Sequence, residues 1–296
     1  MNPEMPGRVL CRSPLTLLVH KSMVTAIFML GCVWTMPAVA ANCAVRSGNF
    51  AVNGLSLYWE EHGESSDPPL LLVHGFGESM AVWEPYVPGL CTRYNVVLLD
   101  LRGHGRSTNP TNRFSFRAAS GDVLALMDHL RHQRFRALGA SAGAIALLHV
   151  ATLAPARVES MVLVSGAPYL TPESRDRIHS IVNGKDPLAY LRQFATRGDQ
   201  QAASLLQQFS DLASSVDDPA FTPPLLGTVT APTLIVHGDR DEFFPVEIAV
   251  QLYRSIPNAY LHVYPNGSHE PIYEPAAVTE FSAELLDFFG GRWNPH

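Results

Sequence analysis

Short apolar runs, each followed by turn-forming residues, recur along the chain from about residue 70 onward. A continuous aliphatic run is typical of a strand that is buried on both faces of a sheet. Between two of the runs, apolar residues recur at helical spacing: Val123, Leu124, Met127 and Leu130. Strands that alternate with helices predict an α/β fold, with a mostly parallel sheet and helices on both faces. The predicted strands span residues 70–73, 96–99, 135–138, 158–165, 233–236 and 261–264.

Two segments depart from this alternation. Residues 49–63 predict an opening antiparallel hairpin with Asn53 and Gly54 at its turn, a pair that favours the tight turns of hairpins. Residues from about 167 to 226 have no strand pattern and contain helical stretches such as 202–212. Breaks in this second segment lie at Pro168, Pro172, Gly184, Pro187 and Pro219. We therefore expect a small helical insertion in an otherwise regular sheet domain.

The first 40 residues have the layout of an export signal. Basic Arg8, Arg12 and Lys21 precede an apolar stretch at 23–36, and Ala-Val-Ala at 38–40 is a small-residue cleavage pattern. We expect residues 1–40 to be a signal peptide that is cleaved after residue 40, which would leave a periplasmic or secreted protein. Residues 41–296 then form one domain.

Two other fates of the leader remain open. Met29-Leu30-Gly31-Cys32 vaguely resembles a lipid-attachment sequence, so a lipid anchor at Cys32 is the minority interpretation. A retained membrane anchor is disfavoured, because Gly31 and Pro37 interrupt the apolar stretch and it falls short of the ~20 apolar residues that a span needs. We expect no stable membrane span.

The net charge of the chain limits the kinds of partner that it can bind. The chain has a formal net charge of −6, and residues 1–40 hold three basic residues and one acidic residue, so their removal would leave −8. An acidic surface argues against nucleic acid as a partner.

Cys43 and Cys91 are the two cysteines after the leader. In an oxidising compartment they can form a disulfide, and two free thiols are the alternative. No spacing typical of metal ligands occurs, so we expect neither metal nor cofactor.

The candidate chemistry begins with Gly139-Ala140-Ser141-Ala142-Gly143, which lies between a predicted strand and the apolar run 144–153. A serine at the tip of a tight strand-to-helix turn exposes its Oγ, and flanking glycines let strand and helix approach closely. The N–H of Ala142 then lies in the first helical turn, where it has no intrahelical acceptor. This segment predicts a nucleophile next to an oxyanion donor.

Two further turns follow predicted strands. Leu70 to Val73 runs into His74-Gly75-Phe76-Gly77, in which the N–H of Phe76 is the second expected oxyanion donor. For His74 we favour a structural role in the turn. After the next strand, Asp100 and Arg102 are interpreted as partners that fix a glycine-rich loop.

Titratable side chains follow the last two strands. Asp241 lies after the strand at 233–236, with Asp239 as the alternative acid, and His269 lies after the strand at 261–264. Ser141, Asp241 and His269 thus occur in the order Ser, Asp/Glu, His, each after a strand. Because the carboxyl ends of parallel strands meet at one edge of a sheet, we expect the three side chains to converge.

From about residue 50 to the C-terminus, these motifs resemble the alpha/beta-hydrolase superfamily. The resemblance rests on His74-Gly75, the loop 100–107, the elbow 139–143 and the Gly-x-x-Asp at 238–241. It implies an eight-stranded sheet and favours Asp241 over Asp239 as the acid. One departure is Ser268, which stands where many relatives have glycine before the catalytic histidine.

The resemblance also implies that residues 167–226 form a lid over the active site. Five apolar residues of this segment have two interpretations, as the lining of an acyl or alcohol pocket or as the lid's own packing face, and the second is favoured for each. They are Phe194, Leu205, Leu206, Phe209 and Leu212.

The expected roles follow from the groups. Serine needs a base, which His269 can supply because imidazole changes protonation near neutral pH. Asp241 would accept the Nδ1 proton of His269 and fix its tautomer. The N–H groups of Phe76 and Ala142 would bind the oxyanion.

The predicted enzyme is a carboxylesterase-like serine hydrolase, which cleaves a small ester or related acyl substrate through an acyl-enzyme. Lactonase, thioesterase, aminopeptidase, perhydrolase and carbon–carbon hydrolase activities can use the same triad. A ligand-binding protein without catalysis is the alternative from another class. The serine at the elbow argues against dehalogenase and epoxide hydrolase chemistry, for which the resembled family uses an aspartate there.

Overall fold

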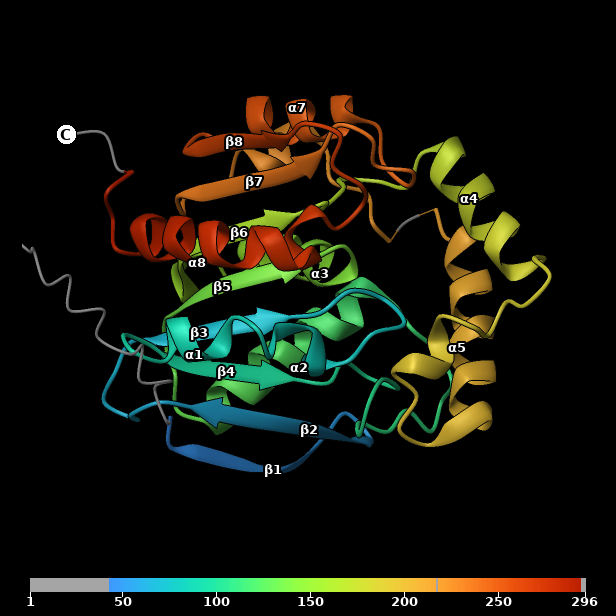
Figure 1. Cartoon of the computed structure of the whole chain (residues 1–296), viewed down its shortest axis with the longest axis horizontal. Helices are drawn as coiled ribbons and strands as arrows, with labels where there is room; N and C mark the ends of the chain where they lie inside the picture. The colour runs from blue at the N-terminus through green and yellow to red at the C-terminus, as the bar shows by residue number, and fades with distance from the viewer. Residues whose placement is uncertain (1–42, 217, 294–296) are drawn as a thin grey trace, which may run out of the picture. The chain divides into compact units, whose positions relative to one another are not determined.

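The computed structural model describes residues 43–216 and 218–293, so the leader, its cleavage site and Cys32 lie outside the described residues. Eight strands form one sheet in the order β1-β2-β4-β3-β5-β6-β7-β8 (Figure 1). β1 and β2 pair antiparallel with each other, and β2 pairs antiparallel with β4, while all other neighbours are parallel. The strands are β1 Val45–Val52, β2 Leu55–His62, β3 Pro69–Val73, β4 Asn95–Leu99, β5 Phe135–Ala140, β6 Val158–Val164, β7 Thr233–Gly238 and β8 Ala259–Tyr264.

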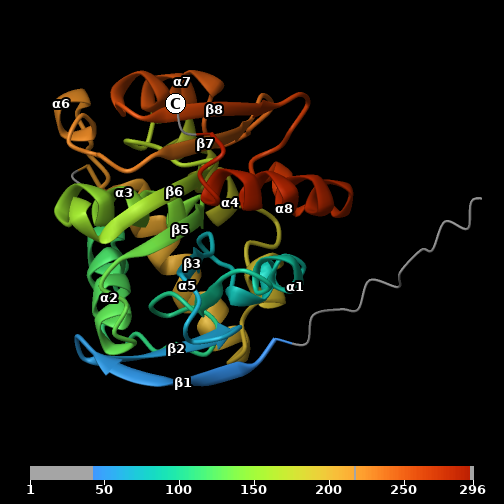
Figure 2. The ribbon, with the colours of Figure 1, turned by 90° about the vertical axis from the view of Figure 1, so that its left-hand side faces the viewer.

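Helices cover both faces of this sheet, which confirms the predicted fold class. α2, α3 and α7 lie on one face, and α1 and α8 on the other (Figure 2). The helices are α1 Val87–Leu90, α2 Phe116–His129, α3 Ala142–Leu153, α4 Pro172–Val182, α5 Gly198–Ala213, α6 Pro223–Leu226, α7 Val246–Ser255 and α8 Pro275–Phe289. The described residues also form four 3-10 turns, η1 Met80–Trp83, η2 Pro155–Arg157, η3 Leu191–Gln193 and η4 Pro271–Tyr273.

The aliphatic runs 70–73 and 96–99 form central strands, β3 and β4, because every side chain in these two runs is buried. In β3, Leu71 and Val73 belong to the core on the α2–α3 side, whereas Leu70 and Leu72 belong to the core on the α1–α8 side. Successive strand residues point to opposite faces, so a strand between two helical layers must be apolar throughout. At roughly 25 cal/mol for each Å² of apolar surface buried, these runs supply much of the stability of the sheet.

The opening hairpin forms as the sequence predicts. Asn53 and Gly54 connect β1 and β2 with φ angles of 49° and 76°. Positive φ at both central residues is the requirement of a type I′ turn, which Asn-Gly meets at low cost.

The segment between β6 and β7 is helical, and it stands at the end of the sheet to which the parallel strands point (Figure 1). α4 and α5 pack against each other there. A single bridge between Tyr169 and Ala220 joins the two ends of the segment. We call residues 167–226 the insertion.

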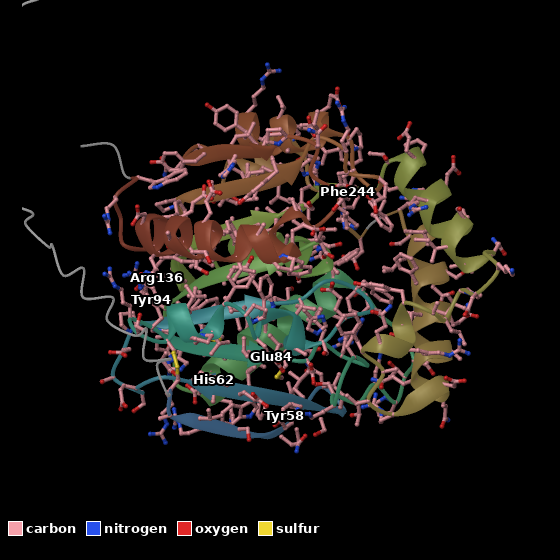
Figure 3. All side chains as sticks on the ribbon, viewed as in Figure 1. Tyr58, His62, Glu84, Tyr94, Arg136 and Phe244 are labelled. Carbon is pink, nitrogen blue, oxygen red and sulfur yellow. A yellow bond between two sulfur atoms is a disulfide. The ribbon has the colours of Figure 1, made fainter. Side chains whose placement is uncertain are left out.

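Cys43 and Cys91 form a disulfide, with their Cα atoms 6.2 Å apart, at the opposite end of the sheet from the insertion (Figure 3). It connects the chain just before β1 to the end of α1, which answers a question that the sequence left open. No helix among the described residues is long and apolar enough to cross a membrane.

We expect Cys91→Ser to lower the free energy of unfolding. The disulfide joins residues 48 positions apart, and closure of a loop of that size in the unfolded chain corresponds to roughly 4 kcal/mol in the chain-entropy account. Urea denaturation of the oxidised protein and the variant measures the difference. Cys43→Ser is the matched control and should lose the same stability, and a reductant should destabilise only the parent protein. Equal stability of parent and variants would contradict a stabilising disulfide.

Candidate active site

Ser141 occupies a strained turn between β5 and α3, with φ 48° and ψ −112°. A non-glycine residue in such a conformation persists only where its surroundings enforce it. Here close packing does so, because a Cβ on Gly139 would lie 2.6 Å from the carbonyl carbon of Gly143, and one on Gly143 would lie 2.2 Å from the Val73 oxygen. The Ser141 N–H also donates to the Val164 carbonyl at 2.8 Å.

The structure brings Ser141, His269 and Asp241 into one hydrogen-bonded chain. The Ser141 hydroxyl donates to Nε2 of His269 at 2.9 Å. Nδ1 of His269 donates to Asp241, at 2.8 Å from Oδ2 and 2.9 Å from Oδ1. Asp239 takes no part, and its buried Oδ1 has no hydrogen-bond partner in the described part of the chain. The geometry therefore favours Asp241, as the spacing predicts.

The surroundings of Asp241 keep it ionised. Burial disfavours its charge, but the hydrogen bond and charge of His269 and the N–H of Phe244 outweigh burial and hold the pKa of Asp241 below its usual 3.8. Oδ1 accepts from the N–H groups of Phe243 and Phe244 at 2.7 and 2.9 Å. His237 donates its Nε2 proton to the Phe244 carbonyl, and burial lowers the pKa of its imidazole. A carboxylate that accepts several N–H groups is also fixed in orientation.

The backbone donors expected from the sequence face the same cavity. Ala142 is the first residue of α3, and Phe76 lies in the turn after β3. Both line the cavity together with Ser141. Neither N–H has an acceptor within the described residues, so both are free to bind an anionic oxygen.

His74 has the structural role that the sequence favours. It is fully buried, its Nδ1 donates to the Gly75 carbonyl at 2.7 Å, and its Nε2 accepts from the Leu101 N–H at 3.0 Å. Burial lowers the pKa of His74 to about 4 and that of the neighbouring His104 to about 3. Both rings are neutral at physiological pH and connect the loops after β3 and β4.

Asp100 and Arg102 fix loops, but the prediction that they are each other's partners is wrong. Asp100 accepts from the N–H groups of Met80 and Arg106 at 2.9 and 2.8 Å. Arg102 pairs with Asp122 of α2 at 2.7 Å. Met80 lies 20 positions from Asp100, and Asp122 lies 20 positions from Arg102. Only the folded chain brings these partners close, so the local sequence did not reveal them.

A cavity of about 520 Å³ adjoins Ser141 and His269. Its walls are mainly apolar and come from the α3 end of the sheet, the loop after β7 and the insertion. Figure 3 labels Phe244 between the end of β7 and the insertion. The apolar lining includes Phe76, Ile145, Leu170, Ile178, Phe209, Leu212 and Phe243.

The five apolar insertion residues divide between the two interpretations. Phe209 and Leu212 line the cavity. Leu205 and Leu206 pack in a small cluster within the insertion, and Phe194 stacks edge-on against Tyr190. Phe209 and Leu212 also pack against the core on the α2–α3 side of the sheet, so both interpretations hold for these two residues.

The sequence analysis missed a cluster of four polar residues, Glu78, Tyr190, Glu270 and Tyr273, of which the last three line the cavity. Glu78 accepts from the hydroxyl of Tyr190 at 2.8 Å and from that of Tyr273 at 3.3 Å. Glu270 follows His269 and lines the cavity with Tyr190 and Tyr273. The only local signal was the position of Glu270 directly after the candidate base. Among the described residues, no group of three or more His, Cys, Asp or Glu has an arrangement that could hold a metal ion.

Comparison with known proteins indicates the same fold. Residues 68–182 match the family model described as alpha/beta hydrolase fold. The chain is 29% identical over 246 residues to the serine hydrolase BPHL of Homo sapiens, covering 79% of this chain and 83% of that protein. It is 28% identical over 258 residues to a pimeloyl-[acyl-carrier protein] methyl ester esterase of Aliivibrio salmonicida, covering 79% and 95%.

Among solved structures, a hydrolase from Pseudomonas aeruginosa superposes with a TM-score of 0.67 at 25% identity, over 83% of this chain and 98% of that one. The fold, the family model and these relatives agree. The chain has the alpha/beta-hydrolase fold.

We expect Gly143→Ala to abolish the elbow geometry. The added methyl would lie 2.2 Å from the Val73 oxygen, a backbone atom that cannot move aside. Either the strand–helix contact opens or the protein loses several kcal/mol of stability, an order-of-magnitude figure for overpacking. Thermal unfolding and fluorophosphonate labelling of Ser141 measure the two outcomes.

Gly121→Ala is the matched control. Gly121 lies within α2, and a Cβ there meets no atom within 4 Å. Alanine should stabilise the helix by roughly 0.5–1 kcal/mol and leave labelling unchanged. Equal behaviour of the two variants would show that the elbow does not depend on Gly143.

Proposed function

We propose that this protein is an exported serine hydrolase that cleaves a small carboxylic ester or related acyl compound. The observation that carries the proposal is the hydrogen-bonded chain from Ser141 through His269 to Asp241, which opens into an apolar cavity. A serine hydroxyl that donates to an imidazole, which donates to a buried carboxylate, is the arrangement that activates serine for attack on a carbonyl.

In the proposed mechanism, His269 takes the Ser141 proton as Oγ attacks the acyl carbon. The oxyanion that forms is bound by the N–H groups of Phe76 and Ala142, each such donor contributing roughly 3–4 kcal/mol to transition-state stabilisation. His269 then protonates the leaving group, which departs and leaves an acyl-enzyme on Ser141. Water attacks this ester with His269 as base, and the acid product is released. Asp241 keeps Nδ1 protonated and stabilises the imidazolium in both steps.

The cavity supports an apolar acyl or alcohol part of modest size. The insertion supplies much of its wall through residues of α4 and α5, such as Ile178 and Leu212. We propose that residues 167–226 act as a lid that excludes water and selects substrate, a function suited to a segment outside the sheet. The esterase name of the relative from Aliivibrio salmonicida supports ester cleavage.

Lactones, thioesters, aminoacyl compounds and carbon–carbon bonds beside a carbonyl remain alternative targets of the same triad. A protein that only binds ligands is disfavoured, because a fold has no structural need for a serine held in a strained turn and hydrogen-bonded to a histidine–aspartate pair. Kinetic screening of the mature protein against these substrate classes would rank the alternatives.

Export is proposed from the leader pattern of residues 1–40. The disulfide between Cys43 and Cys91 supports it, because such bonds persist chiefly in oxidising compartments. Periplasmic and secreted locations are both consistent with this argument, and lipid attachment at Cys32 remains the minority alternative.

We expect Ser141→Ala to lower kcat toward activated short-chain esters by at least about 10⁴-fold, because the acyl-enzyme cannot form. Steady-state kinetics and loss of fluorophosphonate labelling measure the effect.

Asp241→Asn should lower kcat about 10⁴-fold, because the substitution favours the wrong tautomer of the histidine. Asp239→Asn is the matched control and should cost far less. Undiminished turnover by Ser141→Ala would overturn the proposed function, and the reverse ranking of the two aspartate variants would reassign the acid.

We also expect kcat/KM to fall from neutral pH toward about pH 5, because a histidine base accepts a proton only in its neutral form. The pKa of Asp241 lies below 3.8, so this carboxylate stays ionised over that range. The pKa of His74 is about 4 and that of His104 about 3, so neither contributes to the loss. A pH–rate profile with a neutral ester measures this, and a flat acid side would count against a histidine base.

A further inference from the structure

Two carboxyl groups meet beside the turn that carries Phe76. Glu78 lies three residues after Gly75, and Glu270 directly follows His269. A Cβ built on Gly75 would lie 2.9 Å from Oε2 of Glu78 and 2.8 Å from Oε1 of Glu270, and the two side chains are hydrogen-bonded to each other. Two carboxylates in such contact cannot both be ionised, so a hydrogen bond between them requires one proton.

The hydrogen-bond donors around the pair show which member holds that proton. Glu78 accepts from the Gly75 N–H at 2.7 Å, from the Tyr190 hydroxyl at 2.8 Å and from the Tyr273 hydroxyl at 3.3 Å. A group that receives three donors is best satisfied as a carboxylate. Within the described residues Glu270 receives no such set of donors, so it is the protonated member and donates to Glu78.

The charges that face Glu270 point the same way. Burial, followed by the charge of Glu78 and those of Asp241 and Glu242 in the loop after β7, raises the pKa of Glu270 well above 4.5. In the described part of the chain no Lys or Arg forms an ion pair with either member. Burial also raises the pKa values of Glu78, Tyr190 and Tyr273, so the tyrosines remain hydroxyl donors.

We propose that Glu78 and Glu270 share one proton and act as positioning residues, which hold the Gly75–Phe76 turn and the His269 loop in their catalytic arrangement. Glu78 accepts from the Gly75 N–H and so fixes the peptide before the one that carries the Phe76 N–H, and Glu270 connects Glu78 to the His269 loop. Tyr190 extends the same contact to the insertion and Tyr273 to η4. The proposal rests on the proposed function, since the arrangement matters only if Ser141 reacts.

The shared proton also limits the charge beside the oxyanion site. With the proton present, the pair carries one negative charge. Its loss would place two adjacent negative charges next to the turn that offers the Phe76 N–H. Their repulsion separates the turn from the His269 loop, and their field opposes the negative charge that develops on the acyl oxygen. Activity should therefore decline at alkaline pH when the proton leaves.

Glutamine variants distinguish the two members. Glu270→Gln replaces a neutral donor by a neutral donor, whereas Glu78→Gln places an NH₂ group among donors that need an acceptor. We expect Glu78→Gln to lower kcat at neutral pH at least about tenfold more than Glu270→Gln does, a ratio equivalent to one hydrogen bond to a charged group. KM should change less than kcat, because the pair acts on the arrangement of reacting groups. Equal losses, or the reverse order, would overturn the proposal.

The pH profile provides a second readout that loss of stability alone would not move. We expect kcat/KM and the fluorophosphonate labelling rate of the parent to fall toward alkaline pH, and Glu270→Gln to move this alkaline limb upward by at least about one unit. Glu274→Gln, an exposed neighbour of Glu270, is the matched control and should follow the parent. An identical profile for parent and Glu270→Gln, including no alkaline limb in either, would overturn the proposal.

Melting curves of all variants check folding, and if Glu78→Gln does not fold, the Glu270→Gln profile alone decides. Failure of the fluorophosphonate to label the parent would overturn the proposed function and this inference with it. Labelling of the parent with an unmoved alkaline limb would overturn this inference alone.

Discussion

The site depends on the close approach of β5, α3 and the end of β3 around two positions without side chains. Gly139 and Gly143 leave no room for even a methyl group, and that contact holds Ser141 in a conformation that it would otherwise avoid. Because the strained residue lies where a buried strand meets the start of a buried helix, packing of the core maintains the strain. The remaining groups of the site are arranged relative to this fixed oxygen.

The parallel sheet brings the other two side chains of the site to Ser141. Asp241 and His269 follow adjacent strands, β7 and β8, and the carboxyl ends of these strands bring both side chains to the edge that holds Ser141. Burial then gives similar side chains different roles. His74 is buried without a carboxylate partner and stays neutral, whereas His269 lies between a hydroxyl and a carboxylate.

Much of this arrangement could be predicted from the sequence because it depends on local patterns. Aliphatic runs predict the central strands, Asn53-Gly54 the hairpin turn, and residue order the convergence of Ser141, Asp241 and His269. The failures concern pairs that only tertiary structure brings together. Arg102 pairs with Asp122 rather than Asp100, and nothing in the spacing of Glu78 and Glu270 indicates contact between carboxyl groups that are 192 positions apart.

The bridge between Tyr169 and Ala220 has a consequence for how the protein can change. The bridge brings the two ends of the insertion together, so the fifty residues between them leave the sheet domain and return to it at one place. A change in the length of such a closed segment costs little chain entropy. Replacement of these fifty residues would change the walls of the cavity beside Ser141, while β6 and β7 would keep their register. A replacement segment would have to keep the hydrogen bonds that link the insertion to the sheet domain. Tyr190 donates to Glu78, and Gln201 donates to the carbonyls of Gly103 and Gly105.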